Sequence, residues 1–240
     1  MAKPPRPWTV LEHSVETIDD NLWGVVSAVP EFPKGTGMDR RMCIIRLGDG
    51  RLVFHNAIPL DDATLAKVNA WGKPSILVVP IHLHTMDAHA FREKLGVAVF
   101  TSKTVVDKVR EILPVDGTLE DLPGDSTLRC EPLAGTRFGE AAWVVKSGPR
   151  ANLLFCDAIQ NSRPGKGFTA FVFKTMGLTG AELNSPGAYK RRAVSDRAAL
   201  KRDLLRLADT PGLTRLIPSH GEIVGSDAAA RLRAATNKYL

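Results

Sequence analysis

Residues 80–89 read Pro80-Ile81-His82-Leu83-His84-Thr85-Met86-Asp87-Ala88-His89, and they hold three of the six histidines of the chain beside one carboxylate. The apolar run directly before them, residues 75–79, lies between two prolines and predicts a buried strand. The histidines therefore leave the C-terminal end of a strand and enter a loop, where open α/β sheets place ligands. Imidazole and carboxylate are the ligands that zinc, iron and manganese sites favour. The loop predicts a metal site; the alternative is a polar loop whose histidines cap neighbouring backbone groups.

Composition and length indicate a globular protein. The chain has 240 residues, of which 44% are hydrophobic and 24% charged, so it can bury a full core as a single domain over residues 1–240. Its apolar runs all fall short of the ~20 residues that span a bilayer. Residues 1–12 lack the apolar centre of a secretory signal and are expected to form an extended tail. Because Cys43, Cys130 and Cys156 show no C-x-x-C spacing, we expect reduced core residues of a cytoplasmic protein.

Positive charge is concentrated in residues 160–206. This range has ten basic residues against three acids, a local net charge of +7, while the whole chain carries +6. Such a segment is either a solvated face or a local attraction for an anionic ligand. Nucleic acid is not an expected partner, because aromatic residues make up just 6% of the chain and no stacking platform accompanies the basic run.

The pattern along the chain predicts two half-domains. Strands are expected at residues 21–29, 41–47, 51–55, 75–79, 97–100, 127–130, 141–145, 152–156 and 215–217. Helices are expected from an Asp cap at 61–62 to Gly72, over 88–95, from a cap at 101–102, from a cap at Ser195, and over 226–239. This order fits two sheets, each with helices outside. It runs from hairpins to β–α alternation, then to hairpins again and to an α–β–α ending.

Three of the expected strands end in candidate metal ligands. His82 and His84 follow the first strand, Asp157 follows the second and His220 follows the third. Each ligand comes just after an apolar run, so one sheet would bring the strand ends together. His13 and His55 stand alone and are expected at the surface or satisfied within the core.

This pattern resembles the metallo-β-lactamase superfamily. His82-Leu83-His84 is similar to the first pair of that family's H-x-H-x-D-H loop, residues 153–157 look like its bridging-Asp strand, and residues 218–221 look like its last-histidine loop. The resemblance covers about residues 21–240. It implies an α/β (α+β) fold class with a four-layer αββα sandwich.

The same comparison shows where this sequence departs from the family. Asp87 and His89 come later in the loop than the Asp-His of the motif. Thr136 stands in the region of the family's middle histidine, and threonine is a poor zinc ligand beside imidazole. Residues 55–57, His-Asn-Ala, replace the usual Asp-x-Gly. The active site is therefore expected to be divergent, with metal held less tightly than in a complete site.

The resemblance implies a metal-dependent hydrolase acting on an ester, thioester, lactone or phosphoester. Its cofactor would be one or two divalent ions, zinc first and iron or manganese as alternatives, held weakly or lost. Asp87 would be the general base if it is not a ligand. The implied metal ligands are His82, His84, His89, Asp157 and His220.

The resemblance also gives the basic segment a role, because superfamily members place loops and a helix beside the active site at this point. We expect residues 160–195 to be a basic insertion in which Lys190, Arg191 or Arg192 faces the pocket and binds the carboxylate or phosphate of a small-molecule substrate. A membrane is not an expected partner. The alternative function is a protein that keeps this fold, has lost catalysis and serves as a binding or interaction module.

Overall fold

The structure is a computed structural model that describes residues 5–33 and 35–240. Residues 1–4 of the expected tail lie outside the described residues. The chain folds into two compact units, the first made of the N-terminal part up to Ser27 and Arg41–Leu128, the second of Ala28–Arg40 and Arg129–Leu240. Seven α-helices and two sheets form within the described residues.

The first unit is built on a seven-stranded sheet whose strands follow one another in chain order. The strands are β1 (His13–Asp19), β2 (Leu22–Ala28), β3 (Asp39–Arg46), β4 (Arg51–His55), β5 (Lys73–Val79), β6 (Ala98–Thr101) and β7 (Gly117–Thr118). Pairs β1/β2 and β3/β4 are antiparallel, whereas β4 to β7 pair in parallel. Hairpins followed by β–α alternation were expected from the sequence, and the structure confirms both.

Two elements of this sheet were not expected. Strand β1 was missed because it lies at the sheet edge and its sequence, HSVETID, is mostly polar, with only its last two residues buried. The segment 114–125, in which neither a strand nor a helix was expected, contains β7 and the 3-10 helix η1 (Leu119–Asp121). Both are too short to produce a periodic pattern.

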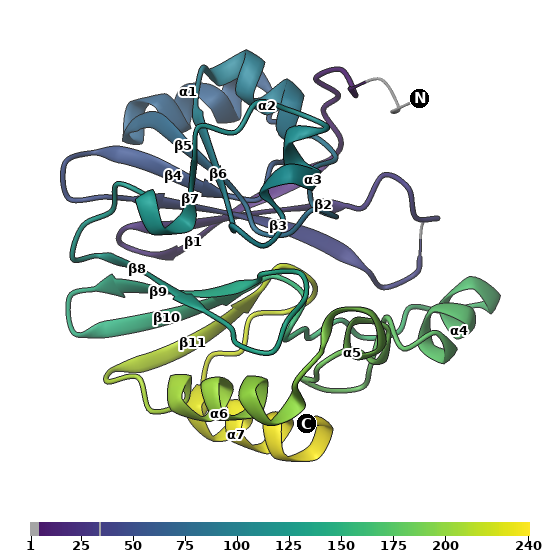
Figure 1. The fold of residues 1–240 in the computed structure, drawn as a ribbon. Helices are drawn as coiled ribbons and strands as arrows, with labels where there is room; N and C mark the ends of the chain where they lie inside the picture. The colour runs from purple at the N-terminus through teal and green to yellow at the C-terminus, as the bar shows by residue number, and fades with distance from the viewer. Residues whose placement is uncertain (1–4, 34) are drawn as a thin grey trace. The chain divides into compact units, whose positions relative to one another are not determined.

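Three helices cover one face of the first sheet (Figure 1). They are α1 (Asp62–Trp71), α2 (Ala88–Leu95) and α3 (Val106–Arg110). Asp61 caps α1 by accepting a 2.7 Å hydrogen bond from the Thr64 amide, as expected. The third helix begins later than predicted, because Ser102 accepts a bond from the Thr104 amide in a turn that precedes it.

The second unit is built on a four-stranded sheet in the order β11-β10-β9-β8. The strands are β8 (Leu128–Pro132), β9 (Ala141–Ser147), β10 (Arg150–Phe155) and β11 (Leu213–Pro218). The β9/β10 hairpin turns at Gly148, whose φ of +57° is in the left-handed region that favours glycine. Strands β10 and β11 pair in parallel, so the residues that follow them leave the sheet at the same edge.

The basic segment is more ordered than the sequence suggested. It contains α4 (Phe168–Thr175) and α5 (Gly187–Ala193), two short helices that the expected insertion of 160–195 did not include. The next helix, α6 (Arg197–Leu207), is capped by Asp196, which accepts a 3.0 Å bond from the Ala199 amide. The expected cap, Ser195, instead donates its hydroxyl to the Gly135 carbonyl.

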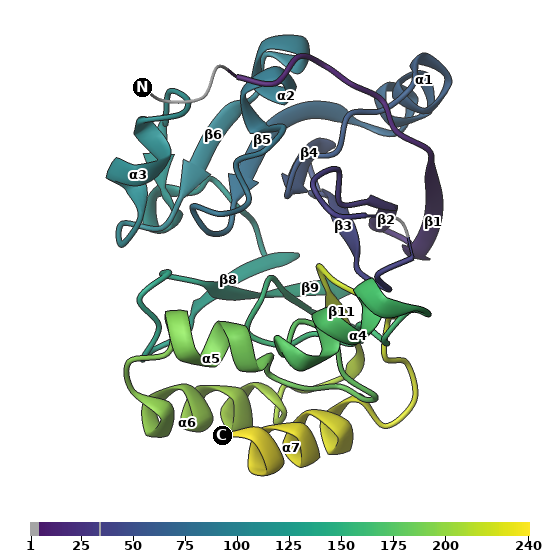
Figure 2. The same ribbon diagram turned by 90° about the vertical axis from the view of Figure 1, so that its right-hand side faces the viewer.

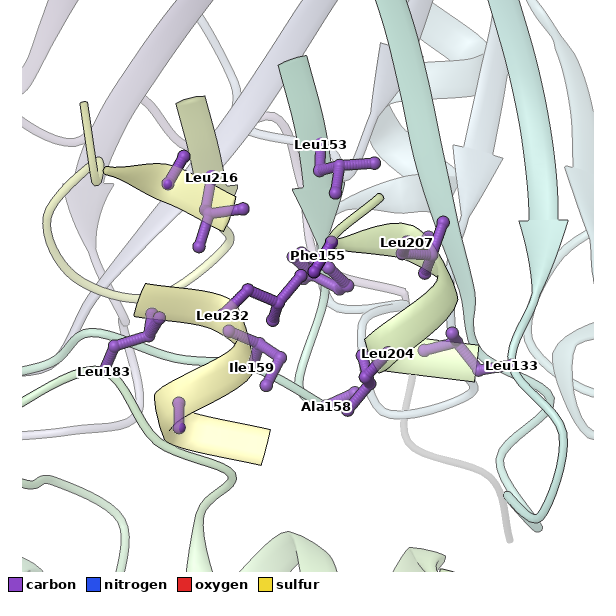
Figure 3. Packing of buried hydrophobic residues seen from close by; sticks show 14 of the residues in the cluster. Leu133, Leu153, Phe155, Ala158, Ile159, Leu183, Leu204, Leu207, Leu216 and Leu232 are labelled. Carbon is purple, nitrogen blue, oxygen red and sulfur yellow. The ribbon is translucent and has the colours of Figure 1, made fainter. Parts of the chain in front are cut away.

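The core of the second unit lies between its sheet and the helices that follow. Figure 2 shows α6 beside the terminal helix α7 (Ala228–Tyr239). Leu204 and Leu232 from these helices meet Leu153, Phe155 and other strand residues in one buried cluster (Figure 3). Full burial of such a side chain is worth about 1.5–3 kcal/mol.

Two further expectations concern composition. No helix among residues 5–33 and 35–240 combines the length and the apolar character that a membrane span requires. The described residues include all three cysteines, which form no disulfide with one another; Cys43 and Cys156 are buried, whereas Cys130 is only half-buried because β8 lies at the edge of its sheet.

Candidate functional site

Asp157 and His220 meet at the edge of the second sheet where β10 and β11 both end. Phe155 pairs with Pro218 in the parallel register, and the Ser219 amide donates a 2.8 Å bond to the Phe155 carbonyl. Two residues beyond the paired ends, the His220 Nε2 atom lies 3.3 Å from the Asp157 Oδ1 atom. The strand register is thus what brings an imidazole and a carboxylate, 63 residues apart in sequence, into contact.

The His220 ring is held in one tautomer. Its Nδ1 atom lies 2.7 Å from the Asp39 carbonyl oxygen, which can only accept, so Nδ1 carries a proton. In the neutral ring Nε2 then presents a lone pair to a carboxylate oxygen. Either a second proton on the ring or a cation bound by both atoms satisfies this contact. Two ligands on zinc bonds of ordinary length lie about 3.4 Å apart in a tetrahedral site, so the pair fits a metal.

Neighbouring groups fix the Asp157 carboxylate and the His220 loop. Gln160 Nε2 donates a 3.1 Å bond to the same Oδ1 atom of Asp157. The residue after the histidine, Gly221, has a φ of +89°, and a Cβ there would lie 2.2 Å from backbone atoms of Asn161. Only glycine fits here, because the loop that contains His220 and Gly221 packs directly against the backbone at Asn161.

Glu140 is a functional candidate that the sequence analysis missed. It is fully buried directly before β9, and its Oε1 atom accepts bonds of 2.9–3.0 Å from the amides of Cys156, Asp157 and Ala158. Burial, followed by the charge of Asp157, raises the pKa of Glu140 to about 8, and the backbone hydrogen bonds oppose this rise. The signal in the sequence was a glutamate directly before an apolar strand, with nothing to identify its partners.

In the first unit, His84 is oriented by a residue that had been noted only as a departure from the family pattern. Its Nδ1 atom lies 2.8 Å from Asn56 Oδ1. The Asn56 amide nitrogen donates to the Arg41 carbonyl, which fixes the oxygen toward His84 and so places the ring proton on Nδ1. Asn56 has a φ of +73°, a conformation that asparagine adopts more readily than most residues. With the proton on Nδ1, the Nε2 atom of His84 carries the lone pair that a metal ligand requires.

The remaining residues of the histidine loop lie between β5 and α2 or in α2 itself. His82 is half-buried, and its carbonyl accepts a bond from the Thr85 hydroxyl. Asp87 is buried and lies 4.0 Å from the guanidinium of Arg6. His89 is half-buried in the first turn of α2. Their roles as ligands or base stay predictions.

The two lone histidines both lie within the first unit. His13 contacts the Leu11 carbonyl through Nδ1 and the Thr64 hydroxyl through Nε2. His55 is buried in β4, and burial, followed by the charge of nearby His84, lowers its pKa to about 3. His55 is therefore neutral across the physiological range of pH.

Thr136 occupies the region in which the family has its middle histidine. Its hydroxyl donates to the Leu133 carbonyl at 3.2 Å and closes a local turn. This side chain has a structural partner of its own.

Two of the three basic residues of α5 have partners as well. Lys190 donates to the Tyr239 carbonyl at 3.1 Å, and burial, followed by the charges of Arg197 and Arg191, lowers its pKa. Arg191 donates to the Met176 carbonyl at 3.0 Å, and Arg192 is exposed. A role of this helix in substrate binding stays a prediction.

Comparison with known proteins gives a likeness of structure. No protein-family model matches the chain, and no curated protein matches it in sequence. The structure is similar to DIM-1 metallo-β-lactamase exposed to ceftazidime, with a TM-score of 0.64 and 11% identity over 96% of this chain and 99% of that one. It is similar to a metallo-β-lactamase from Pontibacter korlensis, with a TM-score of 0.60 and 15% identity over 94% and 99%. It is also similar to FIM-1 from Pseudomonas aeruginosa in the mono-zinc form, with a TM-score of 0.58 and 16% identity over 95% and 96%. The expected α/β fold class is confirmed.

Proposed function

We propose that this chain, which has the metallo-β-lactamase fold, is a metal-dependent hydrolase of a small anionic ester, thioester, lactone or phosphoester. One observation carries the proposal. His220 presents Nε2 to the Asp157 carboxylate at 3.3 Å while its Nδ1 proton is held by the Asp39 carbonyl. A histidine that donates through one nitrogen and faces a carboxylate with the other has the arrangement of a metal ligand with its supporting hydrogen bond.

The proposed ligands are His82, His84, His89, Asp157 and His220. This set of imidazoles and a carboxylate suits zinc, with iron or manganese as alternatives. One or two such ions would lower the pKa of water to about 7 and polarise the carbonyl or phosphoryl oxygen of the substrate.

The chain's own residues would prepare the site for this chemistry. The Asp39 carbonyl and the Asn56 amide oxygen keep a proton on Nδ1 of His220 and His84, so that in each neutral ring Nε2 carries the lone pair. Asp87, if it is not a ligand, would orient the attacking water and accept its proton at a carboxylate oxygen. At least one of Lys190, Arg191 and Arg192 would attract the anionic group of the substrate.

The proposed location is the cytoplasm. The described cysteines form no disulfide, and two of them are buried with pKa values raised by burial, to about 12 for Cys43 and well above the ordinary value for Cys156. Inert, reduced thiols of this kind are typical of a reducing compartment.

A second candidate function is a binding or interaction module that keeps the fold without catalysis. It is favoured by Thr136, whose hydroxyl is engaged with the Leu133 carbonyl in the region of the missing histidine. A site that lacks one imidazole would hold metal less tightly.

Metal analysis distinguishes the two candidates. The protein is purified without chelator, loaded with zinc and desalted, and its metal content is measured by mass spectrometry before a broad hydrolase panel. The hydrolase proposal expects bound zinc and turnover, with both lost in His220→Ala and His84→Ala. His13→Ala is the matched control, because it removes a half-buried imidazole of the first unit that is not a proposed ligand. Equal metal content in His220→Ala and the unaltered protein would refute the proposed ligand set, and zinc binding without turnover would favour the module.

A further inference from the structure

Glu140 is a buried carboxylate for which the proposed hydrolysis has no direct use. It is 0% exposed, and it lies directly before β9, 16 to 18 residues before the amides that it binds. We infer that Glu140 is the positioning residue of the site: it binds the turn of residues 156–158 and thereby aims Asp157 at His220. The effect on metal binding rests on the proposed function, whereas the effect on the turn does not.

The turn after β10 supplies three successive amide donors to one carboxylate. Glu140 Oε1 accepts from Cys156, Asp157 and Ala158, and Oε2 accepts a second bond of 3.0 Å from Ala158. Successive amides that converge in this way form a concave site for an anion. Cys156 and Ala158 are completely buried, so water has no access with which to replace the carboxylate. Glu140 therefore determines the path of the chain as it leaves the sheet.

This path determines where the Asp157 side chain lies. Its amide is bound by Glu140, and its carboxylate Oδ1 contacts Gln160 and His220. The amide of Asn161 donates to the His220 carbonyl at 3.1 Å, which ties the end of the same turn to the histidine loop. A change in the turn would thus move a carboxylate relative to an imidazole whose own position is fixed by the Asp39 carbonyl.

Substitutions at Glu140 separate positioning from stability. Glu140→Leu removes both acceptor oxygens, and Glu140→Gln restores one of them. Leu204→Ala is the matched control, because it removes a fully buried side chain of α6 and weakens the same core without changing an acceptor of the turn. Glu140→Gln keeps the size of the side chain and serves as the deciding variant if Glu140→Leu does not fold.

The first measurement needs no metal. Amide hydrogen exchange is followed at residues 156–158 and, for reference, in β9. We expect exchange at 156–158 to rise at least tenfold relative to β9 in Glu140→Leu, and to rise less in Glu140→Gln. Leu204→Ala should raise exchange at both places together. Wild-type protection of residues 156–158 in the glutamate variants would overturn the inference.

The second measurement uses Co²⁺ as a spectroscopic probe of the metal-free protein. Loss of an outer group that orients a ligand weakens metal binding about 10- to 100-fold. We expect Glu140→Leu to weaken Co²⁺ binding by that factor and to change its visible absorption, with partial recovery in Glu140→Gln and none of these changes in folded Leu204→Ala. An unchanged spectrum and affinity despite loosened amides would refute the aiming of Asp157. If the wild type binds no Co²⁺, the proposed function fails and the exchange result alone decides whether Glu140 holds the turn.

Discussion

The buried imidazole of His55 predicts a specific loss of stability in acid. The side chain is 2% exposed in β4, and burial, followed by the charge of His84, lowers its pKa from the ordinary 6.5 to about 3. In the unfolded chain the same group regains a pKa of about 6.5. At a pH between these two pKa values, the imidazole binds a proton in the unfolded state but not in the folded state. The contribution of His55 is therefore fully present above pH 6.5 and is lost as the pH falls toward 3.

The two pKa values set the size of the effect. At pH 5, proton linkage gives about 2 kcal/mol less stability than at pH 8 from this residue alone. A loss of this size is a large fraction of the 5–15 kcal/mol that is typical of a folded domain. The substitution His55→Gln keeps a side chain of similar size that does not titrate, so it should remove this part of the pH dependence whatever its effect on stability at pH 8.

Urea unfolding tests the prediction. The free energy of unfolding is measured at pH 8, 6.5 and 5 for both proteins, with a chelator present so that metal binding does not contribute. Between pH 8 and pH 5, the free energy of unfolding of the unaltered protein should fall by about 2 kcal/mol more than that of His55→Gln. A difference that stays constant with pH would show that His55 does not resist protonation, and the reasoning from burial would be wrong.

Three further predictions follow from the cap, the metal and the basic helix. Asp196→Ala should lower the free energy of unfolding by about 1 kcal/mol in urea, whereas Ser195→Ala should cost less; the reverse order would return the cap of α6 to Ser195. Prolonged dialysis against chelator should remove all zinc, because one imidazole of a complete site is missing, and two retained equivalents by mass spectrometry would contradict this. Changing Lys190, Arg191 and Arg192 to Ala, Gln and Gln should weaken calorimetrically measured binding of anionic substrates about tenfold, and less at high salt; unchanged binding would leave α5 as a solvated surface.

The elements that could be predicted are those whose sequence carries a periodic apolar pattern between clear boundaries. Helix α2 was placed correctly over residues 88–95, because Phe91 and Leu95 face inward and Gly96 ends the helix in the left-handed conformation. Strand β1 was missed because an edge strand has little to bury. Helix α4 follows Gly167, a residue that has no side chain for capping, so no signal marked where it begins.

The candidate site divides along a similar line. Asp157 and His220 could be predicted from strand ends, because parallel neighbours bring the residues that follow them to one edge. Glu140 could not, because its three partners are backbone amides 16 to 18 residues away, and an amide has no signature in the sequence. The sequence showed Asn56 only as part of the His-Asn-Ala stretch that replaces the family's Asp-x-Gly, and gave no sign that it contacts His84. Its orientation of His84 depends on a carbonyl of β3, 15 residues earlier.

The close approach at Gly221 has a consequence for how this chain tolerates genetic change. A side chain at position 221 would overlap the backbone of Asn161, so every replacement there damages folding, whatever the protein does. Its neighbour His220 is different: if it ligates metal as we propose, replacing its imidazole would remove activity and leave the fold. In a library of random variants, substitutions at codon 221 would be lost in any selection for soluble protein. Substitutions at codon 220 would be lost only where the host needs the hydrolase activity. The contrast between two adjacent codons thus reports, inside a living cell, whether natural selection maintains a catalyst or a scaffold.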